Sequence, residues 1–186
     1  MANDLLLEMV GAVYLFLPAY LANMMPVFAA RLKILQRLRY PIDTGLRWHG
    51  QELFGKNKTV RGFVVGSSGA FAVGVLQYLF ASEMAFLSVV DYSSLAFTLV
   101  LAILLGLGAL VGDCVKSFFK RQLGKKPSTS WLGADQIDYA LGGVLFMLIL
   151  VRPSLTVLLT ILIFSPLASA LANLVGYWFN VKKVWW

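Results

Sequence analysis

The chain has 186 residues, of which 59% are hydrophobic and only 13% are Asp, Glu, Lys or Arg. Soluble domains carry roughly 25% charged residues, and a mean hydropathy of +0.77 gives this chain more apolar side chains than one small core can bury. The composition therefore excludes a water-soluble globule. The single Cys114 excludes an internal disulfide, and the single His49 excludes a histidine-built metal site, so any metal must bind to oxygen ligands.

Uncharged stretches indicate where the chain crosses a membrane, because a charge in mid-bilayer costs several kcal/mol. Five such stretches occur, at residues 9–30, 62–82, 92–112, 139–151 and 153–181. The first three are each long enough for the roughly 20 residues that cross hydrocarbon, and Pro153 separates the last two because proline interrupts a helix. We therefore expect an all-α integral membrane protein, a bundle of five transmembrane helices in a single domain.

The fourth stretch is too short to cross by itself. Its 13 residues rise only about 20 Å as a helix, whereas the hydrocarbon is about 30 Å thick. Extending the helix toward its start brings in Asp138 and Asp135, which lie three residues apart and so share one face near the helix amino terminus. The predicted spans become residues 9–30, 62–82, 92–115, 135–151 and 153–179, with long loops at 31–61 and 116–134.

The basic residues predict the orientation. Fifteen of the 16 Lys and Arg side chains fall on one side of the predicted membrane, and none lies in the segment 83–91 between the second and third spans. The positive-inside rule then predicts that both long loops are cytoplasmic, with the amino terminus outside and the carboxyl terminus inside a cell membrane. No basic residue precedes Arg31, so we expect the first helix to stay in the protein as an anchor and not to act as a secretory signal.

Three acids flank the second predicted loop. Asp113 ends the third span, and an antiparallel return of the chain brings it opposite Asp135 and Asp138 at the membrane surface. Acids are not needed for topology and are costly at the boundary of a short span. Carboxylate oxygens suit Mg²⁺, which commonly bridges carboxylates to substrate phosphates. The sequence therefore predicts a magnesium site formed by these three aspartates.

Two groups of polar residues are predicted to hold phosphate charge. If the third helix continues past Asp113, spacings of three and four residues place Ser117, Lys120 and Arg121 on the same face. In the first loop, a glycine turn precedes a second group that leads into a helix start, namely Lys58, Thr59 and Arg61. Such a turn and helix start bind polyphosphate through backbone N–H groups and cations. This loop is not a nucleotide-binding P-loop, because Asn57 stands where that motif has Ser or Thr.

Asn23 has two interpretations. It lies between Pro18 and Pro26 in the first predicted span, where each proline frees a backbone carbonyl. Its amide could either join helices or contact substrate, and the sequence leaves both open. The glycines that recur every four residues in the second span are interpreted as helix contacts.

The two charged motifs together resemble the phosphatidate cytidylyltransferases, and more closely their archaeal branch, the CDP-archaeol synthases. The matching residues are Gly112-Asp113, Ser117, Lys120-Arg121, Gly124 and Asp135-Gln136-Ile137-Asp138, together with a Phe-Gly-x-x-Lys-Thr-x-Arg-Gly element at residues 54–62. The archaeal branch is similar in its small size, its five spans and its Asp-Gln-x-Asp motif. Bacterial and eukaryotic enzymes have Arg where this chain has Gln136, which argues against phosphatidate as the substrate.

The resemblance implies an enzyme that joins CTP to 2,3-bis-O-geranylgeranylglycerol 1-phosphate with Mg²⁺, releasing pyrophosphate. It implies metal binding by Asp113, Asp135 and Asp138, and neutralisation of phosphate charge by Lys58, Arg61, Lys120 and Arg121. Thr59, Ser117 and Gln136 are further substrate-binding candidates, and Asp43, Gln51 and Asn23 are candidates for contact with cytosine or ribose. The expected partners are CTP, the lipid phosphate and the membrane, with no nucleic acid.

A small cation channel or transporter is the alternative function. In that case the acids line an ion path and the basic loops only set topology. Stabilisation of the protein by CTP together with Mg²⁺, but by neither alone, distinguishes the enzyme from the channel.

Overall fold

The computed structural model describes residues 2–125, 129, 131 and 133–178. The described part of the chain is dominated by α-helices, as expected from the sequence. The elements in order are α1 (Ala2–Arg31), η1 (Gln36–Leu38), β1 (Arg47–Trp48), β2 (Gln51–Glu52), α2 (Val60–Leu79), η2 (Ala85–Leu87), α3 (Leu95–Gln122), α4 (Ala134–Met147) and α5 (Leu155–Trp178). Residue 179, the end of the predicted fifth span, lies outside the described residues.

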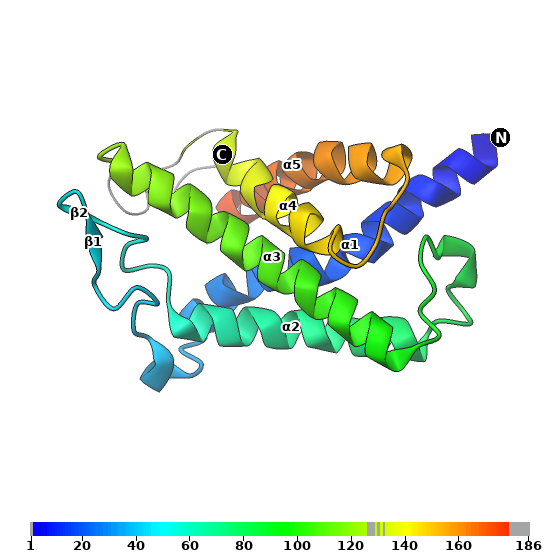
Figure 1. Cartoon of the computed structure of the whole chain (residues 1–186), viewed down its shortest axis with the longest axis horizontal. Helices are drawn as coiled ribbons and strands as arrows, with labels where there is room; N and C mark the ends of the chain where they lie inside the picture. Colours follow the sequence, from blue (N-terminus) through cyan, green and yellow to red (C-terminus); the bar gives the residue numbers. More distant parts are fainter. Residues whose placement is uncertain (1, 126–128, 130, 132, 179–186) are drawn as a thin grey trace.

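The helices form an elongated bundle around α3. This helix packs against α1, α2 and α4, while α5 packs against α1 and α4. Figure 1 shows that successive helices run in alternating directions along the bundle. The carboxyl end of α3 and the amino ends of α2 and α4 therefore lie at the same end of the bundle as the β1–β2 hairpin.

Three helical segments are long and apolar enough to cross a membrane: Asn3–Arg31, Val60–Leu79 and Leu95–Gln122. The outside of the bundle carries large apolar side chains, such as Leu145, Ile163 and Leu171, each more than 60% exposed. Surfaces this apolar face lipid and not water. α4 has 14 residues and begins at Ala134, so it includes both Asp135 and Asp138. Crossing of the membrane by α4 and α5 remains a prediction.

Pro18 lies inside α1 and has no N–H group to donate to the carbonyl one turn earlier. That carbonyl is nevertheless hydrogen-bonded. The Tyr14 carbonyl, which would otherwise accept from residue 18, accepts a 2.7 Å hydrogen bond from the Gln77 side-chain amide of α2. Gln77 is buried. The hydrogen bond thus fixes α2 against α1 at the point where the ladder of α1 is interrupted.

Glycines bring α3 and α4 into backbone contact. A Cβ atom added to Gly142 would lie 2.8 Å from the Gly112 Cα atom and would collide with the Gly108 carbonyl oxygen. A Cβ atom added to Gly112 would collide with the Asp138 carbonyl oxygen. This contact sets the spacing between the parts of α3 and α4 that carry Asp113 and Asp138. The glycines of the second span also lie at helix contacts, since a Cβ atom added to Gly66 would lie 2.9 Å from the Ala22 carbonyl oxygen of α1.

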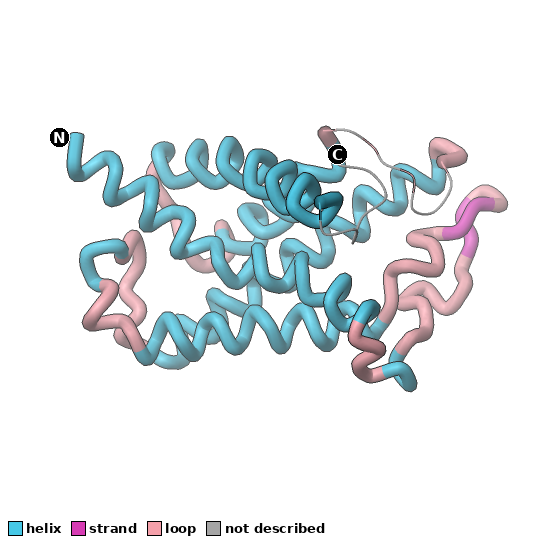
Figure 2. The backbone as a smooth tube through the Cα atoms, turned by 180° about the vertical axis from the view of Figure 1, so that it is seen from behind, coloured by secondary structure: helices cyan, strands magenta, loops and turns pink. Residues whose placement is uncertain are grey.

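The first long loop folds over the end of the bundle. β1 and β2 pair in antiparallel register, with Arg47 opposite Glu52, and the connecting His49 and Gly50 both have positive φ, as a tight hairpin turn requires. β2 contacts α3. Figure 2 shows the same loop from behind, still beside the helix ends. The loop therefore places its basic residues near the end of α3.

Candidate active site

Three aspartates from α3 and α4 surround a single ammonium group. Lys116 Nζ lies 2.9 Å from Asp113 Oδ1, 3.0 Å from Asp135 Oδ1 and 2.6 Å from Asp138 Oδ2. The structure thus brings together the three carboxylates that the sequence placed at the ends of the predicted loop. They converge on one positively charged atom at the end of the bundle.

The local helix geometry explains this arrangement. Asp113 and Lys116 are three residues apart on α3 and so lie on one face. On α4, Asp135 stands in the first turn, where its Oδ2 atom also accepts a 2.7 Å hydrogen bond from the Trp131 N–H. Asp138 follows one turn later and is largely buried. The cluster is therefore built from the carboxyl-terminal third of α3 and the first turns of α4, which their glycine contact holds at fixed spacing.

Lys120 and Arg121 extend the positive charge along α3. Lys120 Nζ lies 2.8 Å from Asp135 Oδ1 and donates a 2.7 Å hydrogen bond to the Thr129 carbonyl. Arg121 lies beside the glycine turn of the first loop, since a Cβ atom on Gly55 would be 3.6 Å from Arg121 Cδ. Both cations are largely buried. The two predicted phosphate-binding side chains therefore sit next to the carboxylates.

The first loop contributes Lys58, whose ammonium forms an ion pair with Asp113. The turn before Lys58 is held by Asp43, whose Oδ2 atom accepts a 2.9 Å hydrogen bond from Phe54 N–H, while its Oδ1 atom accepts a 3.1 Å bond from Gly45 N–H. Asp43 is only 5% exposed. We therefore interpret Asp43 as a residue that shapes the loop, and its contact with cytosine or ribose stays a prediction.

A small cavity of about 140 Å³ lies between this loop and α3. Its lining includes four cations, Lys58, Lys116, Lys120 and Arg121, and one carboxylate, Asp113. A cavity with this charge favours an anion with several negative charges, such as a polyphosphate.

Three other predicted site residues, Thr59, Gln136 and Asn23, do not line this cavity. Thr59 caps α2, its Oγ1 atom accepting a 3.2 Å bond from Gly62 N–H, and Gln136 Oε1 accepts a 2.6 Å bond from Gly133 N–H at the start of α4. Asn23 is half-buried on α1, so the choice between helix contact and substrate contact stays open for it.

Gln51 and Arg61 are two further candidates for contact with substrate. Gln51 lies on the hairpin, opposite Trp48. Arg61 is 6% exposed, and its Nε atom has no hydrogen-bond partner among the described residues. A buried guanidinium nitrogen without a partner is costly, so Arg61 has donor capacity available for an anion.

Ser117, the remaining candidate, lines the cavity, and its hydroxyl donates a 2.8 Å bond to the Asp113 carbonyl within α3. Lys116 is a site residue that was not predicted, because it lies among the basic residues that set the topology. The available signal was its spacing, three residues after Asp113 and four before Lys120, which places it on the same helix face.

Carboxylate oxygens are suitable ligands for a hard divalent cation. The three carboxylates here already share one positive charge, that of Lys116. Within the described ranges, no three acidic, His or Cys side chains lie close enough to hold one metal ion. The Lys116 ammonium stands between the three carboxylates. Asp113, Asp135 and Asp138 are the residues that could hold such an ion.

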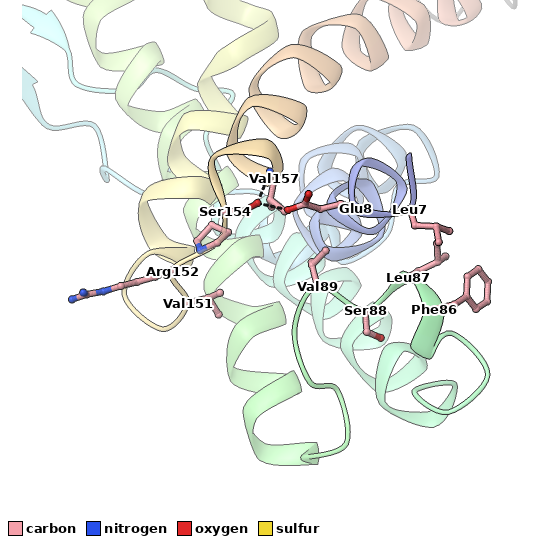
Figure 3. A pocket seen from close by; sticks show the side chains of 11 residues that line it. Leu7, Glu8, Phe86, Leu87, Ser88, Val89, Val151, Arg152, Ser154 and Val157 are labelled. Atoms are coloured by element: carbon pink, nitrogen blue, oxygen red, sulfur yellow. Dashed lines mark hydrogen bonds between the residues drawn. The ribbon is translucent and has the colours of Figure 1, made fainter. Parts of the chain in front are cut away.

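The start of α1, η2 with the segment after it, and the link between α4 and α5 lie at the opposite end of the bundle (Figure 1). They form a larger hollow of about 380 Å³. Figure 3 shows Ser154 hydrogen-bonded to the Glu8 carboxylate, and the Arg152 side chain pointing away from this pair. A hollow with one carboxylate and no inward cation does not suit a phosphate, so we assign the site to the aspartate end.

Comparison with known proteins identifies the family of the chain. The family model for CarS-like CDP-archaeol synthases matches residues 3–186. The CDP-archaeol synthase of Methanosphaerula palustris is 37% identical over 91% of this chain and 99% of its own, and that of Thermococcus gammatolerans is 37% identical over 96% and 97%.

A solved structure gives the same result at the level of the fold. It is described as an intramembrane enzyme for archaeal membrane lipid biosynthesis, and it superposes with a TM-score of 0.71 at 30% identity, covering 87% of this chain and 92% of the other. The likeness in sequence and in fold extends over most of the molecule. The chain therefore belongs to the CDP-archaeol synthase family.

Proposed function

We propose that this protein is a membrane cytidylyltransferase that transfers CMP from CTP to 2,3-bis-O-geranylgeranylglycerol 1-phosphate, giving CDP-archaeol and pyrophosphate. Membership of the CDP-archaeol synthase family supports the reaction. The observation that carries the proposal is the cluster of three aspartates among four cations at one end of an apolar helix bundle. At such a site a soluble triphosphate and a lipid-anchored phosphate can bind next to each other.

The bound nucleotide needs its negative charge offset. In the proposed complex, Lys58, Lys120 and Arg121 neutralise charge on the triphosphate and on the incoming lipid phosphate, because all three line the cavity beside the aspartates. Mg²⁺ held by Asp113, Asp135 and Asp138 would supply further charge neutralisation and orient the CTP phosphates.

The reaction needs no protein base. A phosphate monoester is largely ionised at pH 7, since its second pKa is about 6, and one of its oxygens is itself the nucleophile. That oxygen bonds to the α-phosphorus of CTP while the bond from this phosphorus to the α–β bridging oxygen breaks, and pyrophosphate leaves with the electron pair. Catalysis then comes from in-line positioning and from cations fixed around the phosphates.

We further propose that all five helices cross the membrane and that the site faces the cytoplasm. The alternating helix directions support five crossings, because they put both long basic loops at the same end. That end carries the aspartate cluster. The positive-inside rule assigns it to the cytoplasmic side, where CTP is available.

The test is to incubate the purified chain with labelled CTP and Mg²⁺ and either an ether-linked or an ester-linked lipid phosphate. The proposal predicts formation of the labelled nucleotide lipid and equimolar pyrophosphate with the geranylgeranyl ether substrate. The matched control is Asp113→Asn, which keeps the shape of the side chain and removes its charge. Absence of product with every lipid phosphate, from protein that still binds CTP, would refute the reaction.

The channel alternative gains no support from the site. The three aspartates are paired with lysines at the helix ends and are not spread along a path through the bundle. Stabilisation of the protein by Mg²⁺ without any dependence on CTP would favour the channel.

A further inference from the structure

Lys116 makes contacts that setting topology does not require. Its ammonium pairs with one aspartate on its own helix and with two on α4, at 2.6 to 3.0 Å. Cations that only set orientation extend into water at the membrane surface, whereas the Lys116 side chain is 13% exposed. The charged end of Lys116 therefore contacts the three aspartates and does not extend into water.

Lys116 holds the cluster in a way that its neighbours do not. Lys58 pairs with Asp113, and Lys120 pairs with Asp135. In the part of the chain that the structure describes, only Lys116 contacts all three carboxylates, and it is the cation paired with Asp138. Three carboxylates this close repel one another strongly in a partly buried site, so a shared cation is needed to keep them together.

We propose that Lys116 is a positioning residue, a tethered counter-cation that keeps the three aspartates assembled before the divalent ion arrives and competes with that ion for the same oxygens. This inference rests on the proposed metal site. Lys116 does not react; it keeps the carboxylates at the spacing that α3 and α4 impose, so that the ion meets an assembled set of ligands.

The cavity can take up the Lys116 ammonium when the divalent ion displaces it from the carboxylates. Lys116 also lines the 140 Å³ cavity, together with the predicted phosphate-binding residues Lys58, Lys120 and Arg121. A lysine carries its charge on a flexible four-carbon stem. The Lys116 ammonium can therefore leave the three carboxylates and move into the cavity where the triphosphate binds. Its ion pairs with the aspartates are then replaced by an ion pair with the triphosphate.

The experiment uses the full chain in detergent and follows its melting temperature, first in chelator and then during a Mg²⁺ titration at fixed CTP. Lys116→Met removes the charge but keeps much of the apolar stem, and Lys116→Arg keeps a positive charge. The matched control is Lys56→Met, which removes an exposed first-loop lysine that does not line the cavity.

In chelator, Lys116→Met is expected to melt at a lower temperature than wild type, with Lys116→Arg closer to wild type. In the titration, the half-saturating Mg²⁺ concentration of Lys116→Met is expected to fall roughly tenfold, because no tethered cation competes for the oxygens. Lys56→Met is expected to match wild type in both measurements. If Lys116→Met only packed less well than wild type, it would not bind Mg²⁺ more tightly.

An unchanged or higher half-saturating Mg²⁺ concentration in Lys116→Met would overturn the inference. If Lys116→Met does not fold, Lys116→Gln takes its place, with the same expected fall. If wild type itself shows no Mg²⁺-dependent shift, the proposed metal site fails. A normal wild-type shift combined with an unchanged concentration in the variant refutes the role of Lys116 alone.

Discussion

Replacing Gly142 by alanine tests whether the backbone contact between α3 and α4 sets the geometry of the aspartate cluster. The added Cβ would lie 2.8 Å from the Gly112 Cα atom and 2.9 Å from the Gly112 nitrogen, and would collide with the Gly108 carbonyl oxygen. All three neighbours are backbone atoms, so no side chain can rotate out of the way. The helices must separate.

The magnitude follows from these contacts. Ordinary van der Waals contact begins at 3.4 Å, so the helices need to separate by about 1 Å, which is an overpacking cost of about 1–3 kcal/mol. A misplacement of about 1 Å in a site that works by positioning lowers the rate about 10²-fold. That loss corresponds to about 2.7 kcal/mol of transition-state stabilisation.

The assay is pyrophosphate release at saturating CTP and lipid phosphate, with the melting temperature measured on the same samples. Gly69→Ala is the matched control, because its added Cβ meets the flexible Met25 side chain at 2.8 Å and not backbone. We expect Gly142→Ala to lose about 10²-fold in activity and Gly69→Ala to lose less than threefold. Equal activity of the two variants would show that the helix contact does not control the spacing of the carboxylates.

Three further predictions concern single side chains. Asp138→Asn is expected to abolish pyrophosphate release while the protein still inserts into membranes, and turnover at the wild-type rate would remove Asp138 from the site. Asp43→Ala leaves the Phe54 and Gly55 N–H groups without their acceptor and is expected to raise the KM for CTP about tenfold; an unchanged KM would show that the turn forms without it. Gln77→Leu removes the hydrogen bond to the Tyr14 carbonyl of α1, which has no backbone donor at Pro18. It is expected to lower stability by about 1–3 kcal/mol, measured by denaturant unfolding in detergent; unaltered stability would mean that another group satisfies this carbonyl.

The helical class and the meeting of the aspartates were predictable from the sequence for a simple physical reason. Uncharged stretches of suitable length reveal membrane helices, and the short fourth stretch had to include Asp135 and Asp138 to gain length. In the structure α4 begins at Ala134, one residue before the first of these acids. Alternation of helix direction then brings both acids to the end of α3 that carries Asp113.

The partners of the charged side chains could not be predicted in the same way. Spacing places Lys116 on the face of α3 that carries Asp113, but its contact with Asp138 depends on how closely α4 approaches. Asp43 is a candidate from the sequence for contact with cytosine or ribose, and its carboxylate accepts from N–H groups eleven and twelve residues further along the chain. Neither relation follows from helical periodicity, because both arise only when separate segments pack.

The order of the charged residues along the chain also bears on how the protein is made. Lys58, Lys116 and Lys120 are all synthesised before Asp135 and Asp138, and two of these lysines pair with the acids of α4 in the finished structure. In the proposed five-helix topology, the two carboxylates of α4 would reach the membrane boundary after the lysines of α3 with which they pair. Those lysines would then lower the cost of inserting a segment that is too short and too acidic to partition alone.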